Sequence, residues 1–253
     1  MPHLTGTAST GTGLRTGLGV PGYAHPLVAP AQWERLARPG TPLDWVVLNV
    51  ANGPGTRPDP HCLEAAGRLR NAGVRVLGHL DLAYGARSFG DLLTDAHRHL
   101  DWYRADGFFL DRCPSGREGL PGVRRAAGTL RRISDDPHLV FGHGTHPHPA
   151  YAEHADQLVT FAGSWIDYRF SQVAEWTADY PPDRFCHFVH GMPRGHLEEA
   201  LRIARWQGAA TIYFTDRTDG GGRDTRGAPG DPWEAMPGYW DDIVSRLGTG
   251  VSE

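Results

Sequence analysis

Short apolar runs recur along the chain, separated by longer stretches in which apolar residues stand three and four positions apart. The spacing in these longer stretches predicts amphipathic helices, as in Cys62 to Leu69, Leu92 to Tyr103, Leu120 to Ile133 and Leu197 to Ala204. Eight runs have the length and composition of buried strands: Gly17 to Ala24, Trp45 to Val50, Val74 to Leu82, Gly107 to Cys113, His138 to Gly144, Gln157 to Gly163, Phe185 to Gly191 and Ala210 to Asp216. Regular alternation of strand and helix predicts an α/β protein with a parallel sheet, and eight units predict a (β/α)8 TIM barrel.

The chain length agrees with a single domain of this kind. It has 253 residues, and one (β/α)8 domain takes about 250. We expect a flexible tail rich in Gly and Thr at residues 1–16 and one barrel domain at residues 17–248. An open doubly wound sheet is the alternative, but no Gly-x-Gly-x-x-Gly fingerprint follows the first strand, which argues against a dinucleotide-binding fold.

Composition excludes several functions. The net charge is −4 and the arginines are scattered, so we expect no nucleic-acid partner. All 25 basic side chains are arginine, which rules out Schiff-base chemistry and pyridoxal phosphate anchoring on a lysine. No apolar run has membrane-spanning length, so we expect no membrane partner. No signal peptide is visible, which predicts a cytoplasmic protein, or a secreted one if the sequence is a trimmed form.

Acidic residues close two neighbouring strands. Asp111 ends an apolar run, and His79 and Asp81 end the preceding one on a shared face. The carboxyl ends of barrel strands form the active-site face, so Asp111 and Asp81 are our candidate catalytic pair. The alternatives are structural: Asp111 could cap its loop or pair with Arg112, and Asp81 could orient Tyr84 and Arg87.

Other polar and aromatic residues near the strand ends are typical of a sugar site, where rings stack on apolar sugar faces and polar groups bind hydroxyls. A packing role is the alternative for each. The candidate ligand-binding residues are Tyr23, Asn49, His79, Tyr84, Arg87, Arg112, His143, Trp165 and Asp216.

Histidines could instead form a metal site. His79, His143 and His190 close three strands, but no His-x-His ends the first strand and there is no lysine to carbamylate. The three cysteines are far apart, and their spacing indicates neither a disulfide framework nor a thiolate zinc site. We therefore expect buried cysteines, no cofactor and no metal.

The motifs at these strand ends resemble spherulation-specific family 4. The resemblance runs from Val20 to about Val244. It rests on five segments: Val20–Pro26, Leu48–Gly55, Gly78–Arg87, Trp102–Asp111, and Tyr213–Asp216 followed by Pro232–Trp240. The resemblance implies a barrel related to glycoside hydrolases that act on galactosamine-containing polysaccharides.

The sequence departs from the family pattern at the acidic positions. The resemblance implies Phe-Phe-Asp-Glu after the fourth strand and a Glu after the sixth, but here Arg112 and Ala162 stand in those places and only Asp111 is kept. Arg112 is expected to hold Asp111 ionised. We predict a glycoside hydrolase acting on an amino-sugar glycan, with Asp111 central and Asp81 assisting. The alternatives are a non-hydrolytic barrel that binds a carbohydrate or small molecule, and a repurposed enzyme that uses the histidines. The sequence does not indicate the oligomeric state.

Overall fold

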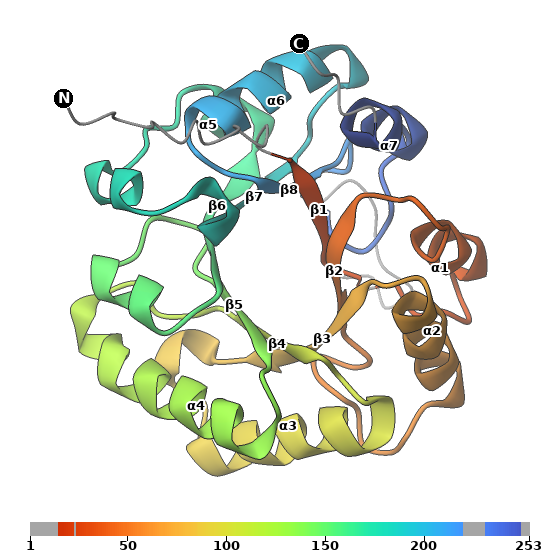
Figure 1. The fold of residues 1–253 in the computed structure, drawn as a ribbon, viewed down its shortest axis with the longest axis vertical. Helices are drawn as coiled ribbons and strands as arrows, with labels where there is room; N and C mark the ends of the chain where they lie inside the picture. The colour runs from red at the N-terminus through yellow and green to blue at the C-terminus, as the bar shows by residue number, and fades with distance from the viewer. Residues whose placement is uncertain (1–14, 23, 220–230, 249–253) are drawn as a thin grey trace, which may run out of the picture.

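Eight parallel strands close into a barrel in the computed structural model, which describes residues 15–22, 24–219 and 231–248 (Figure 1). Each strand pairs with its neighbours in sequence, and β1 pairs with β8 to complete the ring. The strands are β1 (Gly17–Val20), β2 (Leu43–Leu48), β3 (Arg75–Asp81), β4 (Gly107–Asp111), β5 (His138–Gly142), β6 (Gln157–Ser164), β7 (Phe185–His190) and β8 (Thr211–Phe214).

Helices surround this ring on the outside (Figure 1). They are α1 (Pro30–Leu36), α2 (Pro60–Asn71), α3 (Phe89–Tyr103), α4 (Leu120–Ile133), α5 (Trp165–Arg169), α6 (Leu197–Trp206) and α7 (Trp240–Gly248). Side-chain caps begin several of them: Asp59 caps α2 and Ser88 caps α3. The connection from β5 to β6 is short and holds only the 3-10 turn Pro149–Glu153. No helix in the described ranges is long and apolar enough to cross a bilayer.

Aromatic side chains fill the inside of the barrel. The rings of Trp45, Phe109 and Phe188 lie about 6 Å apart, with centroid distances of 5.9, 6.0 and 6.2 Å. The buried indole N–H of Trp45 donates to Oε1 of Gln157 at 2.6 Å. The interior is therefore a packed core, as is typical of this fold.

The predicted barrel is confirmed, and each expected strand is present with its first residue shifted by at most two positions. Several expected strands extend past the last paired residue, because apolar residues of the following loop also pack inward. The expected tail lies outside the described residues except for its last two positions, so the division into tail and barrel stays a prediction.

Candidate active site

Asp111 lies at the end of β4, directly beside Asp81 at the end of β3, and the two are partners in the strand register. Its Oδ2 lies 3.1 Å from Nε2 of the buried His79. Its Oδ1 accepts the backbone N–H of Arg112 at 2.8 Å. The side chain is 32% exposed, so a carboxylate oriented by two donors still faces solvent.

Asp81 has a different environment although it is at the same level of the barrel. Its Oδ1 accepts from Arg112 Nε at 2.8 Å and from the Ala83 amide at 2.8 Å, and its Oδ2 accepts from Arg112 Nη2. Burial raises the pKa of Asp81, but the bonds from Arg112, Ala83 and Asn52 outweigh burial, and the net pKa is lowered. Asp81 is therefore an ionised, covered partner of the guanidinium.

The structure pairs Arg112 with Asp81, and the expectation that Arg112 holds Asp111 ionised stays a prediction. Its guanidinium pairs with Asp81, and only its backbone amide bonds to Asp111. The backbone of Arg112 is in the left-handed region, with a φ of 47°. The bond to Asp81 also raises the pKa of Arg112, so the guanidinium remains charged.

Strained backbone surrounds this ion pair. Ala83 and Tyr84 have φ values of 46° and 55°, so with Arg112 three non-glycine residues occupy the left-handed region. The Tyr84 amide donates to the Arg112 carbonyl at 2.7 Å, and the Arg112 guanidinium carbon lies 5.8 Å from the Tyr84 ring. Such conformations cost about 1–3 kcal/mol each and cluster at functional sites.

A cleft of about 300 Å³ opens beside Asp111. The cleft is lined by Asp111 together with Tyr84, Arg112 and His143, three of the predicted ligand-binding residues, and by Ala162. Phe109, Phe188 and Trp233 add an aromatic wall. The cleft thus combines ring faces, one acidic side chain and one exposed guanidinium, which is the composition expected of a sugar site.

His143 is a neutral part of the wall. Its ring packs edge-on against Tyr151 at 4.8 Å. Burial lowers the pKa of His143 to about 4, with the backbone of Cys113 and Pro114 acting in the opposite direction. In the described part of the chain, His143 does not come together with His79 and His190 at metal-ligand spacing.

Five predicted ligand-binding residues lie outside the cleft lining. His79 bonds to Asp111, and the other four have structural partners. Asn49 accepts the Gly53 amide at 2.9 Å, Arg87 bonds to the Asp81 carbonyl at 3.2 Å, and Asp216 accepts the Gly238 amide at 3.0 Å. Trp165 is buried against Tyr168 and His196. Each of these side chains holds a loop or fills the core. Tyr23 lies outside the described residues.

Trp233, a residue of the cleft lining, was missed. The Trp233 ring lies 5.7 Å from Phe188, and the Trp233 amide donates to Asp231 at 2.9 Å. Asp231 is exposed as a residue, and desolvation around its carboxyl raises its pKa, while the bond from the Trp233 amide opposes the rise. The Asp-Pro-Trp sequence was the available signal, but it follows a Gly-rich stretch that has the composition of a loop.

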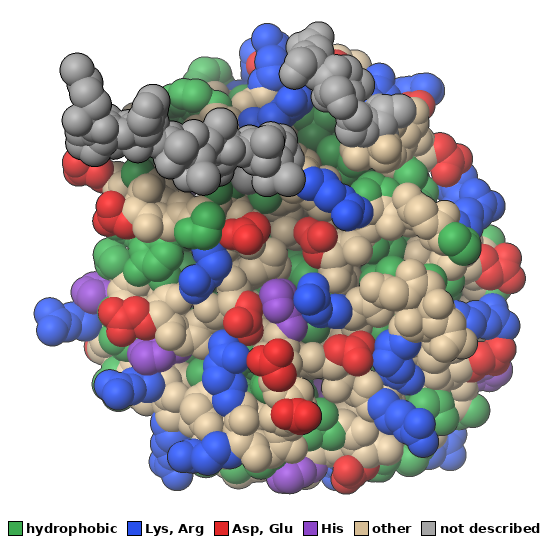
Figure 2. Space-filling model, in the orientation of Figure 1, with side chains coloured by type: hydrophobic (Ala, Val, Ile, Leu, Met, Phe, Trp, Pro, Cys, Tyr) green, Lys and Arg blue, Asp and Glu red, His purple; other side chains and the backbone are tan. Residues whose placement is uncertain are grey.

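The face in Figure 2 intersperses acidic, arginine and histidine side chains, and no large area of one charge dominates it.

The fold and the cleft define the class as a TIM barrel with a polar and aromatic site at the strand ends. The chain belongs to spherulation-specific family 4, whose profile matches residues 18–247. It is 26% identical over 229 residues to Spherulin-4 of Physarum polycephalum, covering 86% of this chain and 67% of that protein.

Solved structures share the fold. Sph3 of Aspergillus clavatus, solved in complex with GalNAc, superposes with a TM-score of 0.77 at 22% identity, covering 94% of this chain and 99% of that one. The spore cortex-lytic enzyme SleL of Bacillus cereus superposes with a TM-score of 0.55 at 7% identity, covering 95% and 76%. At these identities the likeness concerns the fold.

Proposed function

We propose that this protein is a glycoside hydrolase acting on an amino-sugar-containing polysaccharide or oligosaccharide, with Asp111 as the key carboxylate. The observation that carries the proposal is the position of Asp111: among the residues that the structure describes, it is the acidic side chain that lines the cleft. The GalNAc bound to Sph3, a barrel of the same shape, supports an amino sugar as the ligand.

Asp111 suits the role of nucleophile or charge stabiliser. Glycoside hydrolysis passes through an oxocarbenium-like transition state, which a nearby carboxylate stabilises or attacks. His79 and the Arg112 amide fix both oxygens of Asp111 from the barrel side. Donors that are already in place need no reorganisation during the reaction.

Glycoside hydrolysis typically uses two carboxyl groups. Asp81, the strand-register neighbour of Asp111, is ionised and paired with Arg112, so it does not suit the role of proton donor. Asp81 assists in a different way, because it fixes the Arg112 guanidinium at the cleft wall.

The competing proposal is a barrel that binds a carbohydrate without cleaving it. It is favoured by Ala162 and Arg112, which line the cleft where the resemblance implies acidic residues. The same cleft could bind a sugar by stacking and charge without any proton donor.

Turnover of galactosamine-containing oligosaccharides by Asp111→Asn tests both proposals. Because Asn keeps the shape and removes the charge, we expect kcat to fall by about 10²–10⁴-fold or more, with the thermal transition close to wild type. Asp216→Asn is the matched control, since Asp216 also follows a strand but lies outside the cleft lining. Binding by wild type without cleavage of any such glycan would instead support the non-hydrolytic barrel.

A further inference from the structure

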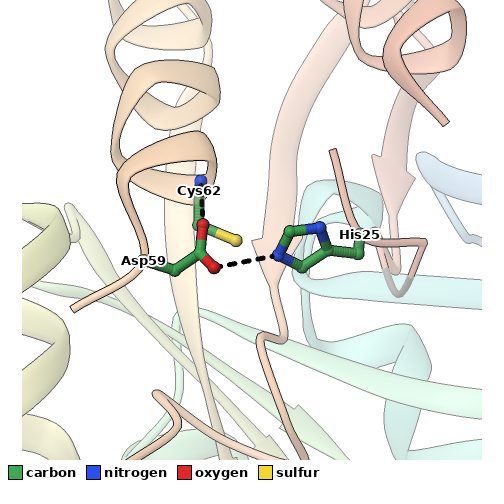
Figure 3. Close-up of side chains that lie close together, drawn as sticks. All are labelled: His25, Asp59 and Cys62. Atoms are coloured by element: carbon green, nitrogen blue, oxygen red, sulfur yellow. Dashed lines mark hydrogen bonds and ion pairs between the residues drawn. The ribbon is translucent and has the colours of Figure 1, made fainter. Parts of the chain in front are cut away.

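Three metal-ligating side chains meet at a second site, between the β1–α1 connection and the start of α2. Figure 3 shows His25 pointing from its loop toward Asp59 and Cys62 on the helix. His25 Nε2 lies 3.2 Å from Asp59 Oδ2, and one ligand atom of each residue lies within 4.8 Å of the others. Among the described residues, this is the one group of three His, Cys, Asp or Glu side chains with such spacing.

The two oxygens of Asp59 have separate partners. Oδ1 caps α2 by accepting the amides of His61 at 2.9 Å and Cys62 at 3.0 Å. Oδ2 is turned toward His25. The Asp59 amide donates to the Tyr103 hydroxyl at 3.1 Å, which fixes the backbone as well. The helix cap therefore holds one carboxylate oxygen toward His25 and away from the helix.

The loop that carries His25 is also anchored. The Trp33 indole donates to the Ala24 carbonyl at 2.7 Å. The amides of Val28 and Ala29 donate to the His25 carbonyl at 2.9 and 3.0 Å. His25 and Asp59 each keep 27% side-chain exposure, whereas Cys62 is buried, so the cluster is reachable from solvent on the side of His25 and Asp59.

We propose that His25 Nε2, Asp59 Oδ2 and Cys62 Sγ bind one Zn²⁺ ion, which ties the β1–α1 connection to α2. One imidazole, one carboxylate and one thiolate form a donor set that suits Zn²⁺ and its probe Co²⁺. The fourth position of a tetrahedron is supplied by water or by the exposed His61, whose ring centroid lies 6.4 Å from that of His25. The proposal is independent of the proposed hydrolase activity.

Binding has a structural cost that can be named. The Leu27 amide donates to His25 Nδ1 at 3.2 Å, so coordination through Nε2 places a proton on Nδ1 and turns this amide away. Burial and the charge of Asp59 raise the pKa of the Cys62 thiol to about 12, and a bound cation would favour the thiolate. Metal binding would thus cost the hydrogen bond from Leu27 to His25 and the proton of the Cys62 thiol.

Titration of the tag-free, chelator-treated full chain with Co²⁺ tests the proposal. We expect one equivalent to produce a thiolate-to-cobalt charge-transfer band that Zn²⁺ abolishes, and saturation to raise the thermal transition. Cys62→Ala should remove the band, and His25→Gln and Asp59→Asn should weaken binding by more than about 100-fold, the upper end for losing an outer-sphere partner. Asp59→Asn keeps a capping oxygen, so α2 is preserved.

Cys186→Ala is the matched control, because Cys186 is also a free buried cysteine but belongs to β7. It should leave the band and its affinity unchanged. The absence of a thiolate band in folded wild type, or its survival in Cys62→Ala, would overturn the proposal. Cobalt binding by histidines elsewhere in the protein would give no thiolate band, and this result would count against the proposal. None of these readouts uses turnover, so failure here is distinguishable from failure of the proposed hydrolase.

Discussion

Asp81 and Asp111 show how neighbouring residues of one type acquire different roles. Both end adjacent strands in register, yet Arg112 covers Asp81 and leaves Asp111 open to the cleft. The sequence places both carboxylates at the rim by counting along strands. It could not show that Arg112 would pair with Asp81, because this ion pair is a contact between residues 31 positions apart.

Asp81→Asn should lower the free energy of unfolding at pH 7 by about 1–3 kcal/mol, a value reduced because Arg112 is partly exposed. The folded pKa of Asp81 is lowered, so its contribution is full above the unfolded value and is lost as pH falls through the folded one. The loss of unfolding free energy in Asp81→Asn, measured by urea unfolding, should therefore be equal at pH 7 and pH 5. Asp101→Asn on exposed α3 surface is the control and should stay within about 0.5 kcal/mol of wild type.

Some strands of this barrel approach each other so closely that only glycine fits at the contact. Gly107 begins β4 where it passes β5, and a Cβ there would lie 2.1 Å from the His138 carbonyl oxygen. Gly128 lies on the exposed side of α4, with nothing within 4 Å of an added Cβ. The sequence does not distinguish these two glycines. The difference in available space comes from the residues that surround each of them in the fold.

Gly107→Ala should cost about 3 kcal/mol or more, because backbone atoms of β5 have to move. Gly128→Ala should stabilise the protein by about 0.5–1 kcal/mol through helix propensity. Thermal or urea unfolding of the two variants gives the comparison. Equal effects at both positions would contradict the close approach of β4 and β5.

The whole molecule contains several buried neutral histidines. Burial lowers the pKa of His99 and His187 to about 3 and that of His143 to about 4. The unfolded chain takes up these protons near pH 6.5, whereas the folded protein does not until lower pH. Because the folded pKa of each histidine is below its unfolded value, the free energy of unfolding falls as the pH decreases from about 6.5 toward the folded pKa.

We therefore expect the free energy of unfolding to fall between pH 6.5 and pH 4, by up to about 4 kcal/mol per pH unit if all three histidines contribute. Urea unfolding across this range measures the slope. His143→Phe, which can keep the edge-on contact with Tyr151, should reduce the slope by about a third. A flat profile would show that these histidines are protonated in the folded state.

The sequence by itself determined the barrel, its strands and the presence of Asp111 at the rim, because hydrophobic periodicity and strand ends are local properties of the chain. Tertiary structure alone decided which predicted residues share the cleft. Asn49, Arg87, Trp165 and Asp216 satisfy loops and core instead, while Trp233 reaches the cleft from beyond β8. The sequence likewise does not reveal the group of His25, Asp59 and Cys62. The pairing of β1 with β2 brings His25 to Asp59, 34 positions away, and to Cys62 on the same helix start. Side-chain partnerships of this kind depend on distances across the barrel rim, and spacing along the chain does not specify them.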